Sequence, residues 1–308
     1  MSAATTRRGL LAGAIAGAAA PALARGQSAP ATLEPKAKRP VVRRGRAIAV
    51  ARGVTVVAHD MRTTIGAGKR TIDVGGQPVG VAVSPDGRIA AVTTAFWEQP
   101  GLALVDLAAG RVGARRKIGP APGEVAFTPD GKHVVIAGGE QEGTLRVLET
   151  ARWRTVAQGR IGRVPRGLAV THDGTHAWVA LNADDRLALV DLRSGRVRRE
   201  LRTAALPDKI ALSPDGARLL VCHGRSDKVS EIDVHSGRER LHAAGRHPSG
   251  VAWTSNGRRL VALGGESAVL ELHGKRFATV EAPRGLAVSG RRFSTVSALT
   301  GQVGGGRV

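Results

Sequence analysis

The sequence predicts an all-β fold, a seven-bladed β-propeller of four-stranded antiparallel blades. A turn motif returns at a nearly constant interval, a proline precedes most copies at the same phase, and each repeat has room for four short strands. Glycine accounts for 41 of 308 residues without a strict Gly-X-Y period, and 42% of the chain is hydrophobic. This composition excludes a collagen-like or a disordered chain and favours many short strands joined by tight turns.

The interval is defined by six prolines and by the turns that follow them. The prolines are spaced by 44, 43, 42, 41 and 35 residues, at Pro78, Pro122, Pro165, Pro207, Pro248 and Pro283. The turns carry Asp-Gly or Asn-Gly, at Asp86-Gly87, Asp130-Gly131, Asp173-Gly174, Asp215-Gly216 and Asn256-Gly257. Because these residues tolerate positive φ, the motif predicts a hairpin between two strands.

The predicted strands and turns follow the same order in each repeat. A short apolar strand follows the proline, at 79–83, 124–127, 167–170, 210–212 and 250–253, and the hairpin turn follows it. A second apolar strand comes next, at 89–92, 133–136, 176–180, 219–222 and 260–263. A third strand ends in three copies with an aspartate, Asp106, Asp191 or Asp233, which we expect to fold onto the following backbone and open a turn. A polar, arginine-rich fourth strand closes the unit, as expected for a solvent-facing outer strand.

The number of blades follows from the length. Five complete units run from residue 78 to 282, an incomplete unit precedes them from about residue 40, and another follows from residue 283 to the end. The residues after position 24 suffice for about seven repeats of this size. Because an open ring would leave sheet edges exposed, we expect part of residues 27–40 to form the outer strand of the last blade. A six-bladed ring, with the C-terminal strand completing the first sheet, is the alternative.

Residues 1–24 have the pattern of a twin-arginine-type signal peptide. Arg7-Arg8 precede Gly9-Leu10-Leu11, and an uncharged stretch ends in Ala22-Leu23-Ala24. Residues 9–24 are shorter than the about 20 apolar residues that a membrane span needs, so no transmembrane segment is expected. We therefore predict an exported protein, periplasmic or extracellular, with an ordinary secretory signal or a short anchor as the alternative. Residues 25–40 are predicted to be a flexible leader, and residues 41–308 a single propeller domain.

The most regular copies resemble the YVTN-repeat β-propeller family. The resemblance rests on Pro165-Arg-Gly-Leu-Ala-Val-Thr-His-Asp-Gly174, His176-Ala-Trp-Val-Ala-Leu-Asn182, Leu187-Ala-Leu-Val-Asp-Leu192 and Ser194-Gly-Arg-Val197, and it covers residues 41 to about 300. It implies a ring of six or seven blades that is usually exported. It does not imply one activity, because propellers host many functions.

Candidate ligand-binding residues come from two sets of loops expected at one mouth of the central channel. They are positions that differ between blades where the scaffold repeats, namely Glu124, Arg166, Asn182, Asp208, Lys209, His223, His247 and Arg284. Arg166, Lys209 and Arg284 share one phase after the blade-opening proline, so three cations would face one axis and attract anions. Glu124 and Asp208 share that phase and could cancel the field by pairing with them.

Three function classes are compatible with these residues. The first is a non-catalytic binding or scaffold propeller whose partner is an unknown protein or a small anionic ligand. The second is a hydrolase or lactonase-like enzyme, although the inner acidic residues are few for a calcium ion. The third is a non-specific polyanion or nucleic-acid binder, suggested by the formal charge of +21.

No cofactor, metal site or catalytic residue is predicted, and the chain is expected to be a monomer. One cysteine excludes a disulfide framework, and Cys222 lies in an apolar strand, where a small buried hydrophobe is expected. His172 and His176 flank a predicted hairpin turn, so we interpret them as turn residues and not as metal ligands.

Overall fold

The computed structural model describes residues 45–95, 101–119 and 121–308, and these residues form seven antiparallel sheets. Six of the sheets have four strands, and the last has three strands among the described residues. Each sheet is one blade, and its strands are joined in sequence order from the inside outwards. The chain divides into two units, Met1–Val41 and Val42–Val308, and all described residues belong to the second.

The strands are numbered in chain order, and each blade takes the next three or four of them. Blade 1 contains β1 (Gly45–Ala51), β2 (Val54–His59), β3 (Thr64–Ala67) and β4 (Arg70–Asp73). Blade 2 contains β5 (Gln77–Val83), β6 (Ile89–Ala95), β7 (Gly101–Asp106) and β8 (Arg111–Arg116). Blade 3 contains β9 (Glu124–Phe127), β10 (His133–Gly138), β11 (Gly143–Glu149) and β12 (Arg154–Gly162). Blade 4 contains β13 (Pro165–Val170), β14 (His176–Leu181), β15 (Arg186–Asp191) and β16 (Val197–Arg202). Blade 5 contains β17 (Pro207–Leu212), β18 (Arg218–His223), β19 (Lys228–Asp233) and β20 (Glu239–Ala243). Blade 6 contains β21 (Pro248–Trp253), β22 (Arg259–Leu263), β23 (Ala268–Glu271) and β24 (Arg276–Ala278). Blade 7 contains β25 (Pro283–Ser289), β26 (Arg292–Ser297) and β27 (Val303–Arg307).

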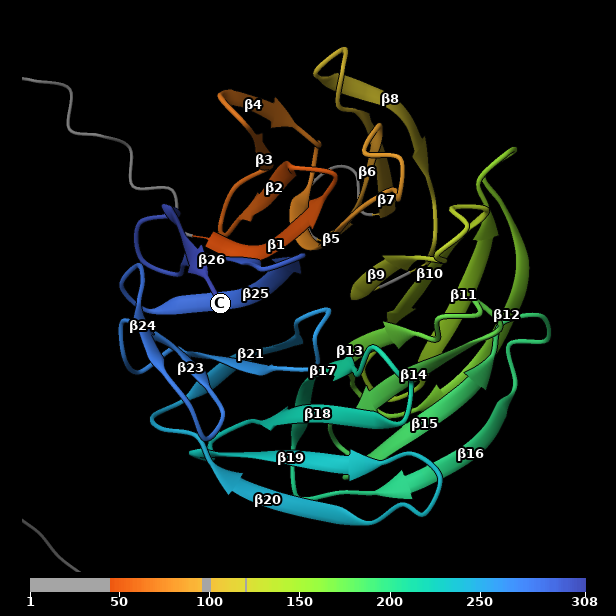
Figure 1. The fold of residues 1–308 in the computed structure, drawn as a ribbon. Coiled ribbons are helices and arrows are strands. Elements are labelled where there is room, and N and C mark those ends of the chain that lie inside the picture. Colours follow the sequence, from red (N-terminus) through yellow and green to blue (C-terminus); the bar gives the residue numbers. More distant parts are fainter. Residues whose placement is uncertain (1–44, 96–100, 120) are drawn as a thin grey trace, which may run out of the picture. The chain divides into compact units, whose positions relative to one another are not determined.

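The seven inner strands form a closed ring. Each of β1, β5, β9, β13, β17, β21 and β25 lies beside the inner strand of the next blade, and β1 lies beside both β25 and β26 (Figure 1). The prediction of a seven-bladed all-β propeller is therefore confirmed, and the six-bladed alternative is wrong. The C-terminal strand β27 pairs with β26 of its own blade and not with the first sheet. The predicted closing strand within residues 27–40 lies outside the described residues.

The repeated turns explain why the first two strands of each unit form a hairpin. The turn glycines Gly87, Gly131, Gly174, Gly216 and Gly257 have φ between 69° and 79°. The preceding Asp or Asn does not adopt positive φ, contrary to what the dipeptide alone suggests. Its side chain instead accepts a hydrogen bond from the Ser or Thr two residues earlier, as Asp86 Oδ1 does from Ser84 Oγ at 2.5 Å. Serine or threonine, aspartate and glycine together therefore specify this turn.

The aspartates that end the third strands act as predicted. Asp191 Oδ1 accepts hydrogen bonds from the backbone of Arg193 at 2.9 Å and of Ser194 at 3.0 Å. Asp233 Oδ1 accepts from the second and third residues that follow it, and Asp106 Oδ1 accepts from the third. These bonds start the turns into the outer strands, whose side chains alternate between exposed and half-buried positions.

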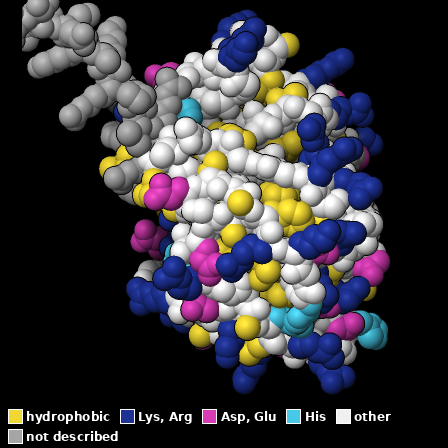
Figure 2. All heavy atoms as spheres, turned by 60° about the vertical axis from the view of Figure 1, so that its left-hand side comes forward, with side chains coloured by type: hydrophobic (Ala, Val, Ile, Leu, Met, Phe, Trp, Pro, Cys, Tyr) yellow, Lys and Arg dark blue, Asp and Glu magenta, His cyan; other side chains and the backbone are white. Residues whose placement is uncertain are grey.

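Hydrophobic side chains fill the spaces between blades. Six clusters each join two consecutive blades, from the one shared by blades 1 and 2, with Val56 and Val92, to the one shared by blades 6 and 7, with Leu260 and Phe293. Charged side chains lie outside these layers, and Figure 2 shows Lys and Arg outnumbering Asp and Glu on the face that it presents. Among the residues described, no helix is long and apolar enough to cross a membrane.

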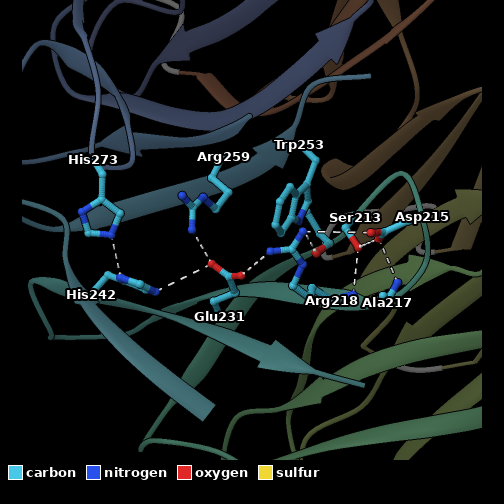
Figure 3. A network of polar contacts seen from close by, with 10 residues as sticks. Ser213, Asp215, Ala217, Arg218, Glu231, His242, Trp253, Arg259 and His273 are labelled. Carbon is cyan, nitrogen blue, oxygen red and sulfur yellow. Dashed lines mark hydrogen bonds and ion pairs between the residues drawn. The ribbon is translucent and has the colours of Figure 1, made fainter. Parts of the chain in front are cut away.

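A polar network also connects blades 5 and 6 (Figure 3). Glu231 on β19 accepts a hydrogen bond from Arg218 on β18 at 2.8 Å and another from Arg259 on β22 at 2.6 Å. His242 on β20 places Nε2 3.7 Å from the same carboxylate, and its Nδ1 lies at a hydrogen-bond distance of 2.9 Å from Nε2 of His273. One buried carboxylate therefore gathers cationic or protonatable groups from two blades.

Candidate functional site at the channel mouth

The residues that follow the blade-opening prolines are displaced from regular pairing toward the channel. The register between inner and second strand shifts directly after Pro78, Pro165, Pro207 and Pro248, and after Arg284 in blade 7. A bulge of this kind leaves a residue without a ladder partner and redirects its side chain. Arg166 and Lys209 lie within these register shifts, Arg284 is paired with Val296 directly before one, and all three side chains line one mouth of the channel.

The mouth encloses a cavity of about 340 Å³. Six of the eight predicted ligand-binding residues line it: Glu124, Arg166, Asp208, Lys209, His247 and Arg284. Arg46 of β1 lines it as well and was not among the predicted residues. Its strand belongs to the incomplete first repeat, whose opening proline and turn are too degenerate to identify this position from the sequence. A narrower cavity of about 130 Å³ continues into the channel and shares Arg46, Glu124 and Lys209 with the mouth.

Lys209 forms an ion pair with Glu124, so one of the three predicted cations is neutralised. The pair connects β17 of blade 5 to β9 of blade 3, and Lys209 Nζ donates to Glu124 Oε1. Burial would lower the pKa of Lys209, but the negative charges of Glu124 and Asp208 outweigh it and raise the pKa. The predicted alternative, in which an acidic residue at the same repeat position neutralises a cation, is therefore observed for Glu124 and Lys209.

Arg46 and Arg284 share a second carboxylate, that of Asp60. Arg46 Nη1 lies 3.4 Å from Asp60 Oδ1, and Arg284 Nη1 lies 3.9 Å from Oδ2. Gln77 Nε2 donates to Asp60 Oδ1 at 3.0 Å. The sequence did not identify Asp60, because it follows β2 in the degenerate first repeat and has no counterpart at the same phase. Arg284 remains half-exposed, and at these distances its attraction to Asp60 is weak.

Arg166 differs from the other cations of the mouth. It is exposed on β13, and it has no hydrogen bond or ion pair with any of the residues that the structure describes. Its blade lies between blades 3 and 5, which hold Glu124 and Lys209. Among the described residues, the mouth therefore has one guanidinium without a partner, that of Arg166, and one weakly held guanidinium, that of Arg284.

Asn182 and His223 do not line the mouth cavity. Asn182 Nδ2 donates to the carbonyl of Pro207 at 3.0 Å and thereby ties blade 4 to the start of blade 5. His223 is buried, with Nε2 2.7 Å from Ser230 Oγ and Nδ1 3.2 Å from the carbonyl of Ala205. Burial lowers the pKa of His223. Both side chains thus have scaffold contacts that the sequence could not reveal.

Other candidate chemistry is weak in the part of the chain that the structure describes. No group of three or more His, Cys, Asp or Glu side chains there could hold a metal ion. His172 Nε2 lies 2.8 Å from the carbonyl of Ser213, in agreement with its interpretation as a turn residue. Cys222 is fully buried, as predicted, and burial raises its pKa to about 12.

Comparisons with known proteins support the fold and nothing finer. No family model matches the chain, and no curated protein matches it. Among solved structures, a chain of Kuenenia stuttgartiensis hydrazine synthase superposes with a TM-score of 0.74 at 17% sequence identity. The superposition covers 90% of this chain and 99% of that chain. At this identity the likeness establishes a shared propeller architecture, and it does not transfer the activity of that protein.

Proposed function

We propose that this protein is an exported binding propeller that holds an anionic group at the mouth of its channel. The ligand class is a small carboxylate, a phosphate or an acidic loop of a partner protein. The observation that carries the proposal is Arg166, an exposed guanidinium without a partner among the described residues, on the rim of a cavity that Arg284 also lines. A guanidinium grips a carboxylate or phosphate through two parallel hydrogen bonds.

The charge around the cavity supports the same ligand class. Four cationic side chains line it, those of Arg46, Arg166, Lys209 and Arg284, against two carboxylates, those of Glu124 and Asp208. Asp60 at the edge offsets one more cation. A modest positive excess remains inside a concave site, where low-dielectric walls focus the field. The export signal at Arg7-Arg8 and the resemblance to YVTN-repeat propellers are consistent with a periplasmic or extracellular binding role.

The test is anion binding by titration calorimetry with citrate and inorganic phosphate as probes. The variant Arg166→Ala plus Arg284→Ala removes two charges from the mouth. The control Arg193→Ala plus Arg202→Ala removes two charges from exposed positions on the outer side of blade 4. We expect the mouth variant to bind at least about tenfold more weakly, since two charge-assisted contacts are lost.

The control should stay within about twofold of the unmodified protein, and the difference should persist at high salt. Equal losses in both variants that vanish with salt would replace the proposal with diffuse attraction to polyanions. Unchanged binding in the mouth variant would remove the mouth as the site.

A further inference from the structure

The turn between β11 and β12 departs from the repeat, and the function proposed for the channel mouth does not involve it. In blades 2, 4 and 5 the fourth residue after the third strand is a glycine, and those glycines have φ between 68° and 73°, at Gly110, Gly195 and Gly237. Blade 3 has Trp153 at this position, with φ of 53°. A bulky side chain in the left-handed region is strained, and such strain is found at functional sites. Ten other described non-glycine residues also have positive φ, so Trp153 is set apart by replacing a glycine that other blades repeat.

Trp153 borders a cavity of about 380 Å³. The cavity lies at the end of the propeller opposite the channel mouth, because inner strands run from the mouth to their hairpin turns. The hairpin turns of blades 1, 2 and 3 line it together with the β11–β12 turn and the end of β9. Arg116 of blade 2 donates Nε to the carbonyl of Trp153 at 3.2 Å, which fixes the strained turn against the neighbouring blade.

The polar groups of this cavity offer both hydrogen-bond acceptors and donors. Asp86 Oδ1 is occupied by Ser84 Oγ and by the backbone N of Arg88, while Oδ2 accepts no hydrogen bond from the described residues. Asp130 uses Oδ1 in the same way and has Lys132 Nζ 4.0 Å from Oδ2. Arg52 donates Nε to the carbonyl of Pro85 at 2.9 Å and also lines the cavity, so the lining includes a cationic donor group.

Charge and aromatic surface together narrow the ligand class. The two carboxylates of Asp86 and Asp130 are balanced by Arg52 in the lining and by Arg88 and Lys132 beside it, so the cavity favours an ion of neither sign. The half-buried rings of Phe127 and Trp153 add an apolar wall. A neutral ligand with an apolar face and hydroxyls at its edge satisfies both features, since its face packs on a ring while its edge meets donors and acceptors.

We propose that this far-face cavity, bordered by Asp86, Asp130 and Trp153, binds a mono- or disaccharide. The wild-type chain is first screened on a printed array covering hexose, N-acetylhexosamine and uronic acid units. The best sugar is then titrated by saturation-transfer NMR against five variants. Trp153→Gly installs the residue that three other blades use at this turn, so the backbone conformation is retained while the packing of the ring against the cluster shared by blades 2 and 3 is lost. Its melting temperature is measured first, and binding is compared at a temperature where the variant is folded.

Asp86→Asn and Asp130→Asn convert the free carboxylate oxygen into a donor and keep the turn intact. The chain itself shows that asparagine is tolerated, because Asn256 Oδ1 accepts from Thr254 Oγ1 at 2.6 Å in the same turn of blade 6. Asp215→Asn is the matched control, since it changes the same turn in blade 5, away from the cavity.

We expect Trp153→Gly to weaken sugar binding at least about tenfold and each cavity asparagine variant to weaken it several-fold, with Asp215→Asn unchanged. A wild-type chain that binds no sugar on the array, or a folded Trp153→Gly that binds as tightly as wild type, would overturn the proposal. The variant Arg166→Ala plus Arg284→Ala should bind the sugar normally, which separates this site from the channel mouth.

Discussion

Replacing Glu231 by glutamine should destabilise the ring at the boundary between blades 5 and 6. The carboxylate is 13% exposed and accepts charge-assisted hydrogen bonds from Arg218 and Arg259 (Figure 3). Such bonds contribute about 1.5–3 kcal/mol each when buried. Arg218 is 43% exposed, so solvent screening reduces its share to about 1 kcal/mol at most. Glutamine keeps one neutral acceptor, and the expected loss is therefore about 2 kcal/mol.

Equilibrium urea unfolding followed by tryptophan fluorescence measures this loss at pH 7.5. For a domain of this size the same change should lower Tm by about 4–8 °C. Glu200→Gln is the matched control, because Glu200 pairs with Arg186 at the exposed surface of blade 4 and should cost at most about 0.5 kcal/mol. If both variants lose the same stability, the network in Figure 3 contributes no more than an exposed ion pair, and Glu231 does not stabilise the boundary between blades 5 and 6.

The pH dependence provides an independent check. Burial would raise the pKa of Glu231, but the hydrogen bonds from Arg259 and Arg218 outweigh it, so the folded pKa lies below the model-peptide value of 4.5. Its stabilisation is present above pH 4.5 and is lost as the pH falls below it. Burial and the neighbouring His273 lower the pKa of His242 below 6.5. Just below pH 6.5, His242 is therefore protonated in the unfolded chain and neutral in the folded chain, which lowers stability.

Glu231 partly offsets this lowering of the His242 pKa, and glutamine removes the offset. As the pH falls from 6.5 towards 5, the variant should therefore lose stability faster than wild type. Below pH 4.5 the gap should narrow, because protonation then removes the Glu231 charge from wild type as well. A gap that stays constant from pH 7.5 to 4 would show that the carboxylate and His242 are not coupled.

Three other outcomes follow from the fold and the sequence. Cys222 should resist alkylation in the native protein at pH 8 and react at the rate of global unfolding, because burial raises its pKa to about 12; rapid native labelling would contradict this. Gly159→Ala should cost about 1–3 kcal/mol by urea unfolding, because a Cβ there would lie 1.9 Å from the carbonyl oxygen of Gly195 in the next blade, and an unaltered midpoint would mean that the two backbones separate easily. Arg7-Arg8→Lys-Lys should leave precursor inside the cell on fractionation, whereas unchanged export would favour the ordinary secretory route.

The repeat predicted the scaffold well because its signals are local. Ser-Pro-Asp-Gly at 84–87 specifies a turn through its own hydrogen bonds, and Pro78 marks the start of the strand that precedes it. Neither feature depends on residues far away in the chain. Blade 1 was the least defined from the sequence, because no proline-turn pair of this kind precedes β2, and Arg46 and Asp60 were missed for that reason.

The charge state of the mouth could not be predicted, because it depends on contacts between blades. Lys209 and Glu124 are 85 residues apart and come from blades that are not neighbours, yet the long lysine side chain reaches across. Their common position in the repeat predicted that both residues lie around one mouth of the channel. It could not predict which cation would pair with a carboxylate. His223 shows the same limit, since its burial results from Ser230 and from the loop before blade 5.

Departures from the repeat therefore need a structural criterion before they indicate a site. Asn182 and Arg166 both differ from their counterparts in other blades, but Asn182 supports a neighbouring backbone while Arg166 has no such task among the described residues. Trp153 departs in the opposite sense, because it occupies a conformation in which three other blades have a glycine. Other non-glycine residues of the ring also have positive φ without lining either cavity, so backbone strain alone does not indicate a site. Strain at a position where the repeat has a glycine, combined with a cavity beside the side chain, is the criterion that selects Trp153.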